Sequence, residues 1–145
     1  MGDLPGREQF SFWVPVSVRW GDMDSYGHVN NAKYFTYCET ARMAYFEAIG
    51  IDGATSQPDL GPAIVRAECN FRHQVRHPAE LDIGVRTSKI GGRTFTLEYG
   101  LFHRGTDDLA ADGASVCVWV DYVAEKALPI PEALIGRIRQ LEDAS

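Results

Sequence analysis

Eight residues near the N-terminus, Asp24 to Asn31, bring together a carboxylate, a glycine and two adjacent asparagines just before a predicted helix. Asparagine is a preferred helix cap, so Asn30 or Asn31 begins that helix. The first turn of a helix leaves backbone N–H groups without intrahelical partners, and the aligned peptide dipoles make this end partly positive. Such an end stabilises a developing oxyanion, and a carboxylate lies seven residues before it. The arrangement predicts a site for acyl transfer.

The helix that positions this site is predicted from Asn31 to about Ile49, and Gly50 ends it. Small or apolar residues recur at the i, i+3, i+4, i+7 spacing of one helical face: Tyr34, Phe35, Cys38, Ala41, Tyr45, Ala48 and Ile49. Further apolar side chains extend this surface around the cylinder, namely Met43, Ala44 and Phe46. Because few of its residues are charged, we expect the helix to be largely enclosed.

Strand patterns fill most of the remaining chain. Apolar and polar residues alternate strictly in residues 94–103, as expected for a sheet with one covered face. Similar runs predict strands at residues 10–20, 63–75, 81–90 and 114–122. Gly91-Gly92 is a hairpin signal between two of them. Glycine and proline predict an irregular loop at residues 51–62, and residues 131–141 predict a short terminal helix.

These elements indicate an α+β fold in which a curved antiparallel sheet wraps around one long helix. The chain has 145 residues, of which 45% are hydrophobic. That length suits one buried core and is short for two ordinary domains, so residues 1–145 are expected to form a single domain.

Composition limits the possible partners and compartments. Twenty acidic and fourteen basic side chains give a net charge of −6, which argues against nucleic-acid binding because phosphates require a basic face. Three cysteines without a Cys-x-x-Cys pair indicate neither a disulfide framework nor a zinc ribbon. We find no leader pattern and no apolar run of membrane-spanning length, so a cytoplasmic protein is expected.

The segment before the predicted helix and the start of that helix resemble a known family. The segment Trp20-Gly-Asp-Met-Asp-Ser-Tyr-Gly-His-Val-Asn-Asn-Ala-Lys-Tyr34, followed in the helix by Glu39 and Ala41-Arg42, is similar to the 4-hydroxybenzoyl-CoA thioesterase type of hotdog-fold acyl-CoA thioesterases. Its Gly-His-Val-Asn-Asn subgroup is especially similar. The order of elements matches over nearly the whole chain, including the hairpin Lys89-Ile-Gly-Gly-Arg93. The resemblance implies a hotdog fold that hydrolyses acyl-CoA to free CoA and a carboxylic acid.

Site roles follow from the resemblance residue by residue. Asp24 stands at the family's catalytic carboxylate, which acts as nucleophile or as general base on water. Asn31 stands where the family's helix gives a backbone N–H to the thioester carbonyl, and Gly27 lets the backbone approach the thioester closely. Basic residues that vary among members bind the CoA phosphates, and Lys89 and Arg93 are the candidates here.

The resemblance also implies assembly and substrate. Family members form homodimers with joined sheets and sites at the seam, or homotetramers as dimers of dimers. CoA is part of the substrate, so no cofactor is expected. The benzoyl-type enzymes carry apolar and aromatic residues where this chain has His28 and Asn30, which favours an aliphatic acyl group.

Several residues have alternative interpretations. Asp24 also suits a turn before a helix. His28 either holds the turn by hydrogen bonding or shuttles protons, and Asn30 caps the helix or binds the attacking water. Glu39 is a reserve base whose default role is an ion pair with Arg42 at i+3.

Some of these residues also suit chemistries other than hydrolysis. His73 and His77 have metal-like spacing without a third ligand nearby, so no metal site is expected. A hotdog protein that only binds acyl-CoA is one alternative. A hydratase or dehydratase acting on acyl thioesters is another, with His28 exchanging protons beside Asp24.

Overall fold

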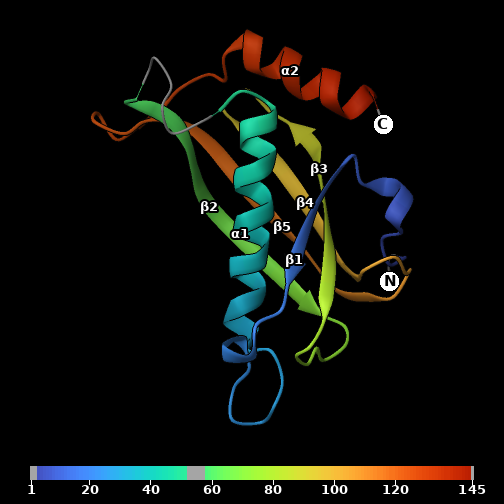
Figure 1. Cartoon of the computed structure of the whole chain (residues 1–145). Coiled ribbons are helices and arrows are strands. Elements are labelled where there is room, and N and C mark those ends of the chain that lie inside the picture. Colours follow the sequence, from blue (N-terminus) through green and yellow to red (C-terminus); the bar gives the residue numbers. More distant parts are fainter. Residues whose placement is uncertain (1–2, 52–57, 145) are drawn as a thin grey trace.

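A curled antiparallel sheet packs against one long helix (Figure 1). The computed structural model describes residues 3–51 and 58–144. The elements, in chain order, are η1 (Arg7–Gln9), β1 (Phe12–Ser17), η2 (Trp20–Asp22), α1 (Asn31–Ala48), β2 (Leu60–Phe71), β3 (Glu80–Ile90), β4 (Thr94–His103), β5 (Leu109–Asp121), β6 (Lys126–Ala127) and α2 (Glu132–Asp143). The α+β hotdog fold expected from the sequence is confirmed.

The sheet has the strand order β1-β3-β4-β5-β2, with every neighbouring pair antiparallel and the short β6 added to β5. The register shifts between Thr87 and Lys89 in β3, and between Ile64 and Arg66 in β2. Such irregularities bend a strand and increase its twist, which helps the sheet curl around the helix. Strands β1 and β2 form the two edges, and β2 lies beside α1 (Figure 1).

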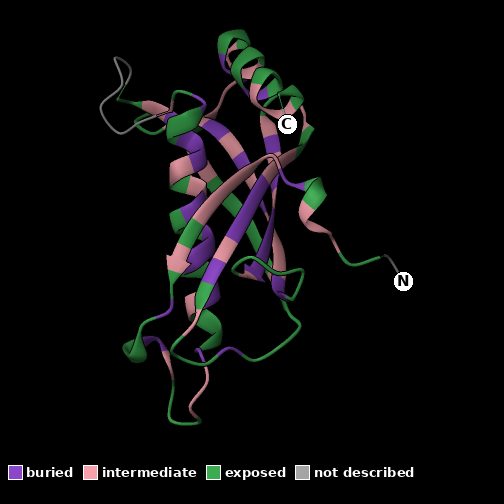
Figure 2. Cartoon of the chain, turned by 45° about the vertical axis from the view of Figure 1, so that its right-hand side comes forward, coloured by how far each residue is buried: buried purple, intermediate pink, exposed green. Residues whose placement is uncertain are grey.

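The alternation predicted for residues 94–103 places one face of β4 in the core. Phe95, Leu97 and Leu101 are fully buried, and Tyr99 is nearly so. They face the buried side of α1, which includes Tyr37, Ala41 and Tyr45. Figure 2 shows the buried residues concentrated where strands and helix meet. The period-two pattern of the strand and the 3.6-residue pattern of the helix therefore describe the same core.

The expectation of a largely enclosed helix is wrong for the single chain. Phe35 is 40% and Met43 57% exposed, both on α1. The sheet of one chain covers only one side of the helix, and the apolar residues on its other side face outward. The helix therefore carries more apolar surface than its own sheet buries.

Strand boundaries differ from prediction mainly in β2 and β5. β2 begins at Leu60, inside the segment predicted as loop, and β5 begins at Leu109 rather than at residue 114. Residues 52–57 of the predicted loop lie outside the described residues. Proline is tolerated in an edge strand, and the Tyr122 hydroxyl donates to the Pro62 carbonyl at 2.7 Å. Proline and glycine therefore did not prevent a strand there.

The predicted terminal helix is confirmed as α2, which lies across the end of the sheet where α1 ends (Figure 1). Leu134 and Ile138 bury its apolar side. The Glu142 carboxylate accepts hydrogen bonds from the Tyr45 hydroxyl at 2.5 Å and the Ser11 hydroxyl at 2.8 Å. The last turn of α2 is thus tied to α1 and to the segment before β1. None of the helices in the described residues is long and apolar enough to cross a bilayer.

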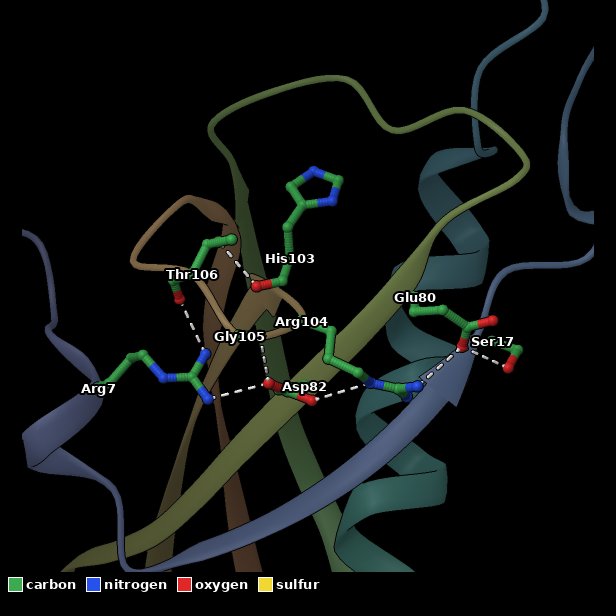
Figure 3. Close-up of polar contacts among 8 residues, drawn as sticks. All are labelled: Arg7, Ser17, Glu80, Asp82, His103, Arg104, Gly105 and Thr106. Atoms are coloured by element: carbon green, nitrogen blue, oxygen red, sulfur yellow. Dashed lines mark hydrogen bonds and ion pairs between the residues drawn. The ribbon is translucent and has the colours of Figure 1, made fainter.

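A polar network joins the N-terminal segment and the β4–β5 turn to the outer face of β3 (Figure 3). The Asp82 carboxylate accepts from Arg7 Nη2 at 2.9 Å, from the Gly105 N–H at 3.1 Å and from Arg104 Nε at 3.3 Å. Arg7 also lies over the Trp13 ring, 4.4 Å from its centroid. Burial alone would raise the pKa of Asp82, but these donors and the Arg7 charge together lower it.

Asp82→Asn is expected to lower the free energy of unfolding at neutral pH by about 1–3 kcal/mol, because charge-assisted hydrogen bonds are lost. A carboxyl whose pKa is lower in the folded state stabilises the protein above its unfolded pKa, near 4, and that stability is lost as pH falls through the folded pKa. The variant should therefore lose less stability than the wild type between pH 5 and 2. Urea denaturation across this range measures the effect, and parallel acid profiles for the two proteins would contradict it.

Candidate active site

The loop before α1 is shaped by a tight set of hydrogen bonds around Asp24. Its backbone N–H donates to the His28 carbonyl at 2.9 Å, and its carbonyl accepts from the Gly27 N–H at 3.0 Å. Its carboxylate Oδ1 accepts from the Tyr26 N–H at 2.9 Å. Gly27 has a φ of 78°, the left-handed region that suits glycine. Asp24 therefore does form the turn, and its side chain remains exposed.

The N-terminus of α1 has a free donor. Asn30 is the cap, and its side-chain oxygen accepts from the Ala32 N–H at 3.0 Å. The Lys33 N–H donates to the Asn30 carbonyl at 2.8 Å. Within the described chain, the Asn31 N–H has no hydrogen-bond partner. This donor is therefore available to an acceptor from outside.

Asp22 fixes the loop from inside the core. It is 2% exposed, and its Oδ2 accepts from the Tyr37 hydroxyl at 2.7 Å and from the Arg19 N–H at 3.0 Å. Its carbonyl accepts from the Asn30 N–H at 2.9 Å. Burial would raise the pKa of Asp22, but the hydrogen bonds and the Arg19 charge lower it overall. Asp22 is therefore an ionised structural residue.

An open cavity of about 360 Å³ adjoins this loop and brings Asp24, His28 and Asn31 together. The remaining lining comes from the same loop, the first turn of α1, the end of β2 and the chain after it: Tyr26, Val29, Tyr34, Phe71, Arg72, His73 and Gln74. The Tyr34 and Phe71 rings pack edge to face, with centroids 5.0 Å apart. The cavity thus combines a carboxylate, a free backbone donor and an aromatic wall.

The His28 ring contacts Arg76, with 3.0 Å between Nε2 and Nη2. Arginine only donates, so the contact requires His28 to carry its proton on Nδ1 and accept at Nε2. Arg76 is exposed. This contact supports the interpretation in which His28 holds the turn.

Gly27 and Asn30 shape the loop and the helix end rather than line the cavity. Lys89 and Arg93 are not near Asp24. They lie at the β3–β4 hairpin, the opposite end of the sheet from the loop before α1 (Figure 1). Lys89 lines a cleft against α2. Lys89 is nine residues beyond Glu80, the first residue of β3, which is about 30 Å along the strand.

Glu39 forms its default ion pair, with 3.8 Å between Oε2 and Arg42 Nη2. Its side chain is 64% exposed. Glu39 is eight residues beyond Asn31 on α1, about 12 Å along the helix. It does not line the cavity that holds Asp24.

Sequence reasoning missed the cavity wall after β2. Arg72 and His73 line it, and Arg72 Nε donates to the Asp112 carboxylate at 2.7 Å. A signal was present in the dense basic run from Arg72 to His77. Among the described residues no group of three or more His, Cys, Asp or Glu is arranged to hold a metal ion.

Comparison with known proteins decides the family. Residues 18–138 match the Thioesterase-like superfamily. The chain belongs to this superfamily. The match spans the loop of Asp24, α1 and every strand from β2 to β6.

Relatives of this thioesterase-like chain include YsmA of Bacillus subtilis, an uncharacterised protein that is 33% identical over 87% of this chain and 86% of its own. The 1,4-dihydroxy-2-naphthoyl-CoA hydrolase of Synechococcus elongatus is 27% identical over 81% of this chain and 87% of its own. A Thermus thermophilus thioesterase, solved with coenzyme A and zinc, has a TM-score of 0.81. It is 33% identical, and the alignment covers 94% of this chain and 98% of that one.

The thioesterase-like superfamily and its named thioesterases support hydrolysis of a thioester as the activity of this chain. That outcome favours the hydrolase over the acyl-binding protein and over the hydratase.

Proposed function

We propose that the substrate is an acyl-CoA, cleaved to free CoA and a carboxylic acid in the cavity beside Asp24. One observation carries the proposal: Asp24, which is exposed, and Asn31, whose N–H is unpartnered, line the same cavity. Named acyl-CoA hydrolases among the relatives, and the solved relative with coenzyme A, support this substrate.

In this proposal Asp24 takes the proton of a water molecule as its oxygen attacks the thioester carbonyl carbon. The C=O electrons move to oxygen, and the resulting oxyanion accepts a hydrogen bond from the Asn31 N–H. Such a donor is worth about 10²–10³ in rate. Collapse of the intermediate breaks the C–S bond and releases CoA thiolate. Direct attack by Asp24, followed by hydrolysis of the anhydride, uses the same groups.

The proposed reaction needs no cofactor, because carboxylate, water and backbone N–H supply each step. Basic groups at the cavity beside Asp24 replace Lys89 and Arg93 as candidates for the CoA phosphates. Arg76 is exposed beside His28, and His73 lines the cavity. Guanidinium groups suit phosphate oxygens well.

We also propose that two copies pair through β2. This strand has twelve residues, forms a sheet edge and exposes Val65 by 62% and Ile64 by 38%. A long apolar edge strand is a template for pairing with another chain. Phe35 and Met43 of α1 would be covered by the same contact. The homodimer would place the acyl chain beside α1 at the seam.

The test of substrate class is thiol release, followed with a chromogenic disulfide reagent, over short, medium, long and aromatic acyl-CoAs. Each acyl group is also supplied on an acyl-carrier protein. We expect release from acyl-CoA, with aliphatic groups preferred. Release from the carrier protein alone would overturn the CoA assignment, and a preference for aromatic groups would overturn the assignment of an aliphatic substrate.

A further inference from the structure

A nearly buried arginine lies away from the proposed reaction centre. Arg42 projects from the middle of α1, and only 12% of its side chain is exposed. It lies over the inner face of the sheet, beside Tyr99 of β4 and Ser115 of β5. A charged side chain is costly to bury unless it is well paired, so the cost of burying Arg42 depends on its hydrogen-bond and ion-pair partners.

The partners of Arg42 are weak and largely neutral. Its Nη1 lies 3.3 Å from the Tyr99 hydroxyl and 3.5 Å from the Ser115 hydroxyl, both at the long end of hydrogen bonding. The two hydroxyls already bond to each other at 2.9 Å. The nearest carboxylate of the described residues, Glu39, is 3.8 Å from Nη2 and mostly exposed. A guanidinium has five N–H donors, so most of its capacity is unused.

Arg42 also lines a largely apolar cavity of about 290 Å³ between α1 and the start of β2. Its lining comprises Arg42, Met43, Phe46, Ile51, Pro58, Leu60, Gly61, Pro62, Ile64 and Tyr122. Arg42 is the one charged group among these described lining residues. Among the described lining residues the nearly buried guanidinium is therefore the single cation and no carboxylate accompanies it, which favours an anionic ligand. A planar fork of donors fits a carboxylate best.

We infer that this cavity receives the distal end of the acyl group, and that Arg42 selects acyl chains ending in a carboxylate. The inference rests on the proposed acyl-CoA hydrolysis and names its substrate class as ω-carboxyacyl thioesters. Tyr99 and Ser115 hold the guanidinium in place from below. Burial raises the pKa of Tyr99 to about 12, so its hydroxyl stays neutral and does not compete as an anion.

Helix geometry sets the required chain length. Arg42 is eleven residues beyond Asn31, about 16 Å along α1. Helical side chains lean towards the N-terminus, which shortens the span from the thioester to the guanidinium to roughly 10–16 Å. An extended alkyl chain advances about 1.25 Å per C–C bond, so about 8–13 bonds bridge it. Between the two ends the chain passes along a cleft whose apolar lining includes Phe35, Cys38 and Ile64. Its two carboxylates, Glu39 and Glu68, are mostly exposed.

The experiment compares CoA thioethers ending in a carboxylate with the matched thioethers ending in methyl, over 6 to 14 carbons. Binding is measured by calorimetry, so it does not depend on turnover. We expect carboxylate-terminated ligands to bind more tightly from about ten carbons upward, by about 10–100-fold. Hydrolysis of the corresponding thioesters should show the same preference, in KM rather than in kcat.

Arg42→Met should abolish the preference while leaving binding of methyl-terminated ligands within about threefold. Arg42→Lys keeps the charge and should retain part of it. Glu39→Gln is the matched control and should leave the preference intact. Equal binding of both ligand series by the wild type, or equal losses for both in Arg42→Met, would overturn the inference. Carboxylate-selective binding without thiol release would contradict the proposed hydrolysis and leave the binding assignment standing.

Discussion

Replacing Asp24 with asparagine is expected to lower kcat for acyl-CoA hydrolysis by about 10²–10⁴-fold, the usual contribution of a general base. The variant should fold normally. Asparagine retains the side-chain oxygen that accepts the Tyr26 N–H, and it suits this type of turn as well as aspartate does. The substitution therefore removes the charge and the basicity of the side chain and leaves its shape nearly unchanged. Because the carboxylate acts in the transition state, KM should change little.

Thiol-release kinetics measure this loss, with thermal unfolding as the check on folding. His28→Ala is the first comparison, since it removes the ring contact with Arg76 but keeps the backbone carbonyl that holds the Asp24 N–H. We expect it to cost less than about tenfold in kcat. Glu39→Gln should be close to wild type. Wild-type turnover in Asp24→Asn, with a large loss in Glu39→Gln, would move the base to Glu39.

The elements that sequence predicted best are those with a local physical cause. Asn30 caps α1 because its side chain bonds a neighbouring N–H. β4 begins and ends at the predicted residues 94 and 103, and its burial alternates from Thr94 to Tyr99. The loop of Asp24 was also recognisable, because its glycine and asparagines act within a few residues. The residues that form these features are close together in the sequence, so their pattern can be recognised from the sequence alone.

Features that depend on distant pairing were missed or misplaced. Lys89 and Arg93 follow the site in plausible sequence order, but the strand direction carries them to the far end of the sheet. The start of β5 at Leu109 depends on pairing with β4 and β2, not on its own residues. Arg42 does pair with Glu39, as the i, i+3 spacing predicted. Its burial against Tyr99 and Ser115 required knowledge of which strands lie beneath the helix.

The second large effect is expected at the exposed edge of β2, where Val65→Lys should dissociate the proposed dimer. Val65 falls at the register shift between Ile64 and Arg66, so this chain's own ladder does not depend on it. A lysine on a strand edge opposes pairing because its charge would have to be desolvated. In a two-fold dimer the substitution is present in both chains. Each lysine should weaken the free energy of association by about 1–3 kcal/mol. The dimer dissociation constant should rise by about 30-fold or more.

Sedimentation velocity over a range of protein concentrations measures the dissociation, and kcat/KM for acyl-CoA is followed on the same samples. If the site lies at the seam, activity should fall in step with the fraction of dimer and recover at high concentration. Val123→Lys is the matched control, because Val123 is 75% exposed in the turn after β5 and lies off the β2 edge. A monomeric wild type would contradict pairing through β2. A monomeric variant with full activity would show instead that each chain carries a complete site, with the cavity beside Asp24 sufficient by itself for hydrolysis.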